Sequence, residues 1–236
     1  MPKKILLLIF TFAISLSSCA APSARDEALK RRAEREEQTR VTERQESDIY
    51  NRFFDAVSRN RAGEVRALIN KGIDPETVDR NGETALMVAA RAGNDDVINT
   101  LLTMGAKVDS ASAYGDTALM VAALSGHRST VELLLKQGAS VSRKGWTPMH
   151  YAATGGHNEI IAVLFDYLAD LNARAPNGTT PLMMAVRQGH PATVKLLIDL
   201  GADVNLRNDS GASAMDWAIR GSNEEIRAYL QQQKAN

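Results

Sequence analysis

The stretch GETALMVAARAGNDDVINTLLTMGA at residues 82–106 decides the fold, because GDTALMVAALSGHRSTVELLLKQGA at residues 115–139 repeats it 33 positions later. Its central four letters recur as TALM at 84–87 and 117–120, TPMH at 147–150, TPLM at 180–183 and SAMD at 213–216. The intervals are 33, 30, 33 and 33 residues. A fixed period of this length predicts a stack of similar units, each one supersecondary element.

Each four-letter motif is interpreted as the start of a helix. Its Thr or Ser is a good N-cap, since the hydroxyl accepts a hydrogen bond from a backbone N–H two or three residues further on. Pro148 and Pro181 fall at the first helical position, where a missing N–H costs nothing. The expected caps are Thr84, Thr117, Thr147, Thr180 and Ser213.

The second half of each unit carries two apolar columns three residues apart, which predicts a second, amphipathic helix. The first column is Val65, Ile98, Val131, Ile161 and Val194. The second column is Leu68, Leu101, Leu134, Leu164, Leu197 and Leu230. The glycines expected to end these helices in the left-handed conformation are Gly72, Gly105, Gly138 and Gly201. One unit cannot bury this stripe alone, so the units must stack.

The 33-residue period and the T-P-L-H-like motif resemble the ankyrin repeat over about residues 50–236. The resemblance implies an all-α solenoid of about six stacked helix pairs with finger loops. The expected units are 50–79, 80–112, 113–142, 143–175, 176–208 and 209–236. We interpret the outer two as caps, because residues 50–72 lack the motif and Arg227 and Gln231 replace aliphatic residues.

Two departures flank the third full unit. Residues 140–144 are three residues shorter than their counterparts, so the finger before Thr147 must be clipped. Leu168 stands where glycine ends the other helices, at a cost of about 1 kcal/mol if the left-handed conformation is kept. Either this segment is locally bent or softened, or the departures are drift without function.

Residues 1–18 have the pattern of an export signal: Lys3 and Lys4, then the apolar run ILLLIFTFAISL at 5–16, too short to span a bilayer comfortably. Cys19 is the only cysteine, and LSSC at 16–19 resembles the lipobox of bacterial lipoproteins. The resemblance implies lipid attachment at Cys19. Ala20 then implies an anchor in the bacterial outer membrane, facing the periplasm. An ordinary signal peptide with a stray cysteine is the alternative.

A tether is expected between this anchor and the repeats, at residues 19–49. Residues 23–48 are crowded with charge and have no apolar stripe, so a coiled coil is not expected. A solvated helix and a fluctuating spacer both fit this composition, and a partner-binding helix is a further alternative. The segment would reach about 45 Å if helical and about 100 Å if extended.

The sequence offers no recognisable catalytic motif. His127, His157 and His190 occupy one position of successive units, roughly 8–10 Å apart, too far to share a zinc ion. The resemblance gives them structural hydrogen bonds instead, and His150 ends the TPMH motif. The paired acids Asp95-Asp96 and Glu224-Glu225 suit the first turn of a helix. Met87, Met120, Met183 and Met184 are interpreted as core residues. We therefore expect no enzyme, no catalytic residue, no metal and no cofactor.

Function is instead expected on the surface that the ankyrin family uses to bind proteins, formed by finger tips and the exposed side of each first helix. By register this surface presents Arg80, Asn81, Glu83, Arg91, Tyr114, Asp116, Leu124, Arg143, Lys144, Trp146, Arg174, Asn177, Thr179, Arg187 and Arg220. It holds more bases than acids although the chain balances 28 bases against 28 acids, which predicts an acidic patch on the partner. The alternative is that these arginines only keep the solenoid soluble.

The sequence thus predicts a membrane-anchored, monomeric ankyrin module for protein–protein interaction in the bacterial envelope. An inhibitor or immunity-type protein is the sharper version. The alternative is a structural or protective envelope lipoprotein, acting in envelope maintenance or oxidative-stress defence without one tight partner. The balanced net charge provides no general attraction to nucleic acid.

Overall fold

A computed structural model describes residues 24–234. The expected export signal and Cys19 lie outside the described residues. Within the described range, no helix combines the length and the apolar composition needed to cross a membrane. The chain divides into two compact units, Met1–Asp48 and Ile49–Asn236, and the second holds all the repeats.

The first helix, α1, runs without interruption from Ala24 to Ser58. Over residues 24–48, which belong to the expected tether, the helical alternative is therefore the one observed. Ion pairs one turn apart, such as Arg32–Glu36 at 2.9 Å and Arg31–Glu27 at 3.6 Å, lie along its exposed surface. Each such pair contributes only about 0.3–0.5 kcal/mol, so this part of the helix is a solvated element stabilised by local propensity.

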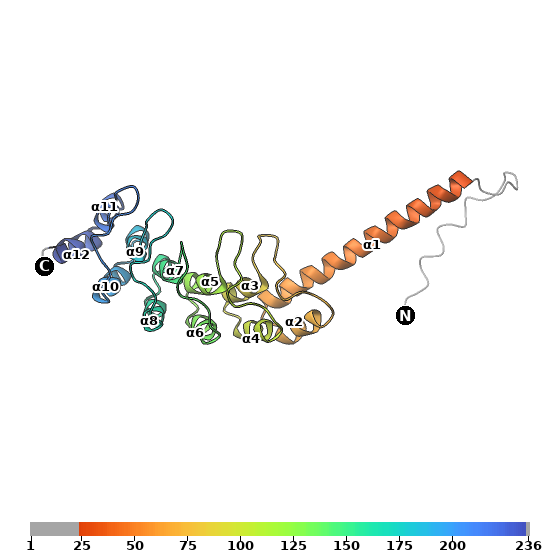
Figure 1. The fold of residues 1–236 in the computed structure, drawn as a ribbon, viewed down its shortest axis with the longest axis horizontal. Coiled ribbons are helices and arrows are strands. Elements are labelled where there is room, and N and C mark those ends of the chain that lie inside the picture. Colours follow the sequence, from red (N-terminus) through yellow and green to blue (C-terminus); the bar gives the residue numbers. More distant parts are fainter. Residues whose placement is uncertain (1–23, 235–236) are drawn as a thin grey trace. The chain divides into compact units, whose positions relative to one another are not determined.

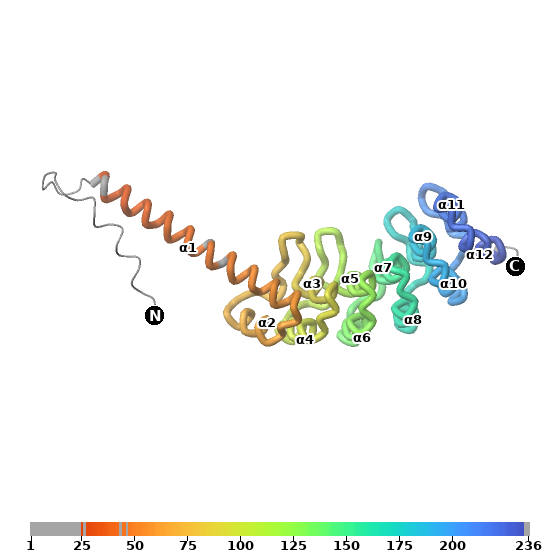
Figure 2. Tube along the Cα trace, turned by 180° about the vertical axis from the view of Figure 1, so that it is seen from behind, coloured from red at the N-terminus to blue at the C-terminus, as the bar shows by residue number. Residues whose placement is uncertain are grey.

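We call the second compact unit, Ile49–Asn236, the repeat unit. Its described residues form six helix pairs, which confirms the predicted all-α repeat solenoid. The end of α1 pairs with α2 (Ala62–Ile69). The other pairs are α3 (Ala85–Ala92) with α4 (Asp95–Thr103), α5 (Ala118–Ser125) with α6 (Arg128–Lys136), α7 (Pro148–Gly155) with α8 (Asn158–Asp166), α9 (Pro181–Gln188) with α10 (Pro191–Asp199), and α11 (Ala214–Arg220) with α12 (Glu224–Lys234). We call the first helix of each pair the inner helix and the second the outer helix. Loops project on one side of the inner helices, and the outer helices α4, α6 and α8 lie on the other (Figure 1). Figure 2 shows the same order from behind.

The core is one continuous layer between the inner and outer helices. Every residue of the two predicted apolar columns is at most 3 % exposed. The small pairs Ala89-Ala90, Ala122-Ala123 and Ala152-Ala153 are fully buried where neighbouring inner helices meet. Met87, Met120, Met183 and Met184 are also buried, which confirms that they fill the core.

The predicted helix starts are confirmed in their hydrogen bonds. The hydroxyls of Thr84, Thr117, Thr180 and Ser213 each accept from the backbone N–H three residues on, at 3.3–3.4 Å. Thr147 differs because His150 follows it in the motif. Its hydroxyl lies 2.9 Å from Nδ1 of His150, and its backbone N–H donates to the same nitrogen at 3.2 Å.

The buried His150 is held as a neutral imidazole. Nδ1 accepts from Thr147, so Nε2 carries the hydrogen and donates to the Thr179 carbonyl of the next repeat at 3.0 Å. Burial lowers the pKa of His150, and the hydrogen bond to Thr179 only partly opposes this. The ring therefore acts as a structural link between two repeats.

The clipped finger at residues 140–144 is closed differently from the other fingers. In the fingers at 79–83, 112–116, 175–179 and 208–212 the first residue donates its N–H to the carbonyl of the last, at 2.8–3.0 Å. Within the described chain the clipped finger has no such backbone bond. Its local bond is from the Ser140 hydroxyl to the Ser142 carbonyl at 2.8 Å, and the Ser140 N–H donates to Asp109 at 3.0 Å. This finger is the least closed of the five.

Leu168 keeps the left-handed conformation of the glycines it replaces, with a φ of 63°. The turn after α8 is the same as the turn after α6: Ala169 N–H donates to the Leu164 carbonyl at 3.0 Å, as Ala139 N–H does to Leu134. A leucine in this conformation costs about 1–2 kcal/mol relative to its preferred regions. The expected strain is therefore present.

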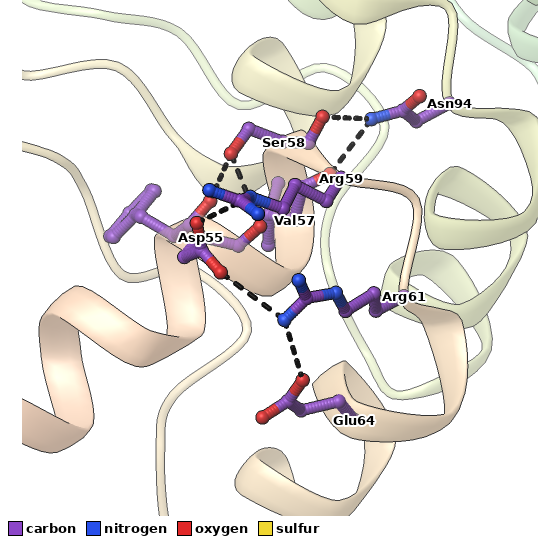
Figure 3. A network of polar contacts seen from close by, with 8 residues as sticks. Asp55, Val57, Ser58, Arg59, Arg61, Glu64 and Asn94 are labelled. Atoms are coloured by element: carbon purple, nitrogen blue, oxygen red, sulfur yellow. Dashed lines mark hydrogen bonds and ion pairs between the residues drawn. The ribbon is translucent and has the colours of Figure 1, made fainter.

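A polar network secures the first helix pair to the second (Figure 3). Asn94 donates to the carbonyls of Val57 and Ser58 at 2.9 and 3.0 Å, which satisfies two carbonyls at the end of α1. Arg61 joins α1 to α2 through Asp55 at 3.2 Å and Glu64 at 3.4 Å. The first pair, which lacks the capping motif, is thus held by side chains.

In the later repeats a histidine occupies the position of Asn94. Nε2 of His127, His157 and His190 contacts the carbonyls of Arg91, Leu124 and Thr154 in the preceding repeat, at 2.9–3.0 Å. These are the structural hydrogen bonds expected from the resemblance. No group of three or more possible metal ligands gathers among residues 24–234.

We call the hydrogen bonds of His127, His157 and His190 to the preceding repeats the histidine ladder. Because of it, a side chain added at Gly126 should lower the stability strongly. The φ of Gly126 is +81°, and an added Cβ would lie 2.6 Å from Cε1 of His157. Gly115, with a φ of +84° and open space around it, provides the matched control. We expect Gly115→Ala to cost about 1–2 kcal/mol from backbone strain alone and Gly126→Ala clearly more, in chemical denaturation. Equal losses would show that the histidine contact does not limit this position.

His150 predicts a pH dependence of stability. Its pKa is lowered in the folded state, so below about pH 6.5 the unfolded chain binds more protons and the unfolding free energy falls as pH falls. The slope from one group is at most about 1.4 kcal/mol per pH unit. His150→Met copies the motif of the other repeats, and we expect it to flatten this slope between pH 7.5 and 5.5. An unchanged slope would exclude His150 as its source.

Candidate functional site

The structure places most of the predicted surface residues on the finger side of the repeat unit. Arg80, Asn81, Tyr114, Arg143, Lys144, Arg174 and Asn177 are exposed on the fingers, and Arg91, Arg187 and Arg220 are exposed at the ends of inner helices. Glu83, Asp116, Leu124 and Trp146 are partly buried. We call this set the finger surface. Tyr114, at 88 % exposed, is its most accessible aromatic residue.

Thr179 does not belong to the finger surface, because its side chain is fully buried. The next finger contacts this one two residues before Thr179, where the Asp209 N–H donates to the carbonyl of Asn177 at 3.0 Å. The Thr179 carbonyl accepts from His150, and its hydroxyl oxygen has no hydrogen-bond partner in the described chain. The expectation that Thr179 presents a contact to a partner is corrected accordingly.

The two acids of the finger surface are already engaged within the chain. Glu83 forms an ion pair with Arg91, and Asp116 accepts a hydrogen bond from the phenol of Tyr151. Burial, then the bond to Asp116, raises the pKa of Tyr151 well above its usual range, so the phenol stays protonated as the donor. The phenol of Tyr151 is neutral, so Asp116 keeps its negative charge, and the ion pair of Glu83 uses one base of the surface, Arg91. The basic excess comes from the seven bases of the finger surface, which outnumber its two acids.

A groove at the C-terminal end of the finger surface brings basic and aromatic side chains together. It has a volume of about 530 Å³ and is lined by Asn177, Arg187, Trp217, Arg220 and Gly221. The guanidinium of Arg187 lies over the Trp217 ring, 5.6 Å from its centroid. Arg187 and Arg220 have no ion pair with any carboxylate of the described chain. We call this the arginine groove.

The surface residues predicted from the sequence did not include Trp217. The missed signal is positional: Trp217 stands four residues after its cap Ser213, one turn into the inner helix, as Tyr151 does after Thr147. At the position of Trp217 other units have the buried Val121 and Met184. The position three residues later is exposed or partly buried and holds Arg91, Leu124, Thr154, Arg187 and Arg220. A tryptophan beside two arginines of this column forms the groove.

A smaller apolar recess, with a volume of about 190 Å³, is formed by residues of α5, α7 and α9 and by Trp146. Its lining residues are Leu124, Trp146, Tyr151, Thr154 and Met184. Trp146 packs edge-on against Tyr151 and His150, with ring centroids 6.4 and 5.2 Å apart. The recess and the arginine groove together offer apolar and cationic contacts on one side of the inner helices.

The chemistry of these groups is that of binding. A guanidinium donates hydrogen bonds in a planar fork that matches a carboxylate, and an indole ring supplies apolar area and a face for cations. Neither group is a nucleophile or a general base at neutral pH. The arginine groove therefore fits an anionic group attached to an apolar or aromatic segment.

Comparison with known proteins supports the architecture described above. Residues 50–112, 105–175 and 167–236 each match the family model for ankyrin repeats in three copies. No curated protein matches the chain. Ankyrin repeats generally act as protein–protein interaction modules and not as enzymes. Since these matches span the whole repeat unit, the chain belongs to the ankyrin-repeat family.

Proposed function

We propose that the chain captures an acidic protein through its finger surface, with the arginine groove as the centre of the contact. The observation that carries this proposal is the pair of guanidiniums of Arg187 and Arg220, which flank Trp217 without an internal carboxylate. A partner carboxylate would complete two charge-assisted hydrogen bonds there. Trp and Arg are also the residue types that most often supply binding hot spots.

Electrostatics support the choice of an acidic partner. On the finger surface Arg91 pairs with Glu83, and Arg174 pairs with Asp209 at 3.4 Å. The other bases of this surface form no ion pair within the described chain, so an approaching protein meets mainly these bases. Like-charge contacts at an interface are strongly unfavourable, whereas opposite potentials accelerate association. The repeat stack holds these bases in fixed positions, which reduces the entropy lost on binding.

We further propose that the repeats act at the bacterial outer membrane, facing the periplasm, after lipid attachment at Cys19. The lipobox-like stretch LSSC at 16–19 supports this location. A rigid binding module near a membrane suits an inhibitor or immunity-type protein, which occludes another protein by covering its surface. The envelope-maintenance alternative predicts no tight partner, so the experiments below distinguish the two.

Charge reversal in the groove tests the binding proposal. We expect the full chain, crosslinked in cells and purified by a C-terminal tag, to retain one acidic protein. Arg187→Glu with Arg220→Glu should weaken that capture by at least tenfold, because two carboxylates would then face the partner's acids. The matched control is Arg66→Glu with Lys136→Glu, which makes the same charge change at exposed positions on α2 and α6.

The outcomes separate four interpretations. Loss in the groove variant alone supports the arginine groove. Equal capture by both variants places the contact elsewhere on the repeats, and equal loss shows that only net charge matters. Capture of no protein by the unmodified chain would contradict the binding proposal and favour the envelope-maintenance role.

The anchor has its own test. We expect the full chain made in a diderm bacterium to incorporate an alkyne-labelled fatty acid and to sediment with the outer membrane. Cys19→Ser should abolish the label, since the thiol is the proposed attachment atom, and should remove the protein from the outer-membrane fraction. Ser18→Ala, one residue earlier, is the control. Sedimentation and labelling unaffected by Cys19→Ser would exclude lipid attachment at this residue.

A further inference from the structure

Exposed apolar side chains gather at the end of α8, away from the finger surface. Phe165, Tyr167 and Leu168 are 38 %, 43 % and 88 % exposed within four residues of chain. At the position that corresponds to Phe165, Leu135 of the preceding repeat is only 5 % exposed. Most outer-helix ends of this stack are polar or glycine, so a concentration of large apolar residues here is a local property of one repeat.

Leu168 has no structural reason to be leucine. The turn that it forms, with Leu168 N–H donating to the Phe165 carbonyl at 2.8 Å, is the turn that Gly138 forms with Leu135 at 3.0 Å. Glycine would adopt the left-handed φ of 63° without strain. Because the leucine side chain is almost fully exposed, packing inside the chain does not offset that strain.

A groove lies beside Leu168. It has a volume of about 560 Å³, and its lining includes Phe165, Asp166, Leu168, Asp170 and Asn172. The ionisable groups among these are the carboxylates of Asp166 and Asp170, and both residues are exposed. Neither has an ion pair with a base in the described part of the chain; Asp170 accepts only from the backbone N–H of Asn172 at 2.8 Å.

We propose that this groove is a second interaction surface, which binds a basic segment of a partner protein. An apolar side chain of the segment packs against Leu168 and Phe165, and lysine or arginine residues beside it pair with Asp166 and Asp170. The charge of the lining selects the occupant: two unpaired carboxylates attract a basic segment and repel an acidic one. They also repel an anionic lipid surface, which disfavours a membrane as the occupant.

This surface differs from the arginine groove in place and in charge. The arginine groove is formed by inner helices and fingers and is cationic, whereas the Leu168 groove is formed at the ends of outer helices and is anionic. The inference therefore does not depend on the proposed function of the finger surface. A chain with both surfaces can hold two partners, or two parts of one partner, at the same time.

The test is selection of peptides from a random twelve-residue phage library on the tagged full chain in detergent, with counter-selection against Leu168→Gly. We expect peptides with an apolar residue flanked by lysine or arginine. Synthetic copies should bind at least tenfold more weakly to Leu168→Gly and to Asp166→Asn with Asp170→Asn. Leu168→Met keeps an apolar side chain and should keep the binding, and Arg187→Glu with Arg220→Glu should leave it unchanged.

Loss of folding is excluded as an explanation by the choice of variant. Leu168→Gly relieves the left-handed strain, so it should unfold at the same or a higher denaturant concentration than the unmodified chain. Recovery of no peptides, of acidic peptides, or of peptides that bind Leu168→Gly equally well would overturn the proposal. Binding to phosphatidylglycerol vesicles that is reduced by Leu168→Gly would also overturn it, in favour of a membrane surface.

Discussion

No helix pair of this protein can bury its own apolar face, and every other property of the repeat unit depends on that constraint. The columns headed by Val65 and Leu68 become solvent-free only when the next pair stacks on them. Stability is therefore a sum of similar contacts between neighbours. Polar links act between the same neighbours: Asn94 in the first junction and His127, His157 and His190 in later ones each bind a carbonyl of the preceding repeat.

Stacking also separates the positions that hold the structure from those free to vary. Caps, columns and the ladder recur in nearly every unit because each has the same neighbours. The position of Arg187 is exposed or partly buried in every unit, so the core places little demand on it, and its occupants differ from unit to unit. Substitutions on the finger side can therefore change binding specificity without a change in the core. The arginine groove is one such local combination.

Leu168 differs from these variable positions. It stands at a position where glycine ends most of the other outer helices, and the turn does not require a leucine. The turn after α8 tolerates it because the hydrogen bonds of the turn involve only the backbone. The cost is local strain, and the side chain ends in solvent beside two carboxylates. In a repeat protein such an exception is easy to recognise, because the other copies provide the reference.

The sequence alone determined the helix starts at Thr84, Thr117, Thr180 and Ser213 and the two buried columns, since each depends on residues close in the chain and repeated at a fixed period. Only the tertiary structure decided that Thr179 is buried, that Leu168 keeps the left-handed conformation and that Trp217 joins Arg187 in a groove. Side-chain exposure between fingers depends on how one loop lies on another, here through the Asp209 to Asn177 hydrogen bond. A periodic pattern shows which residues share a position, but contacts between neighbouring units decide which of them reach solvent.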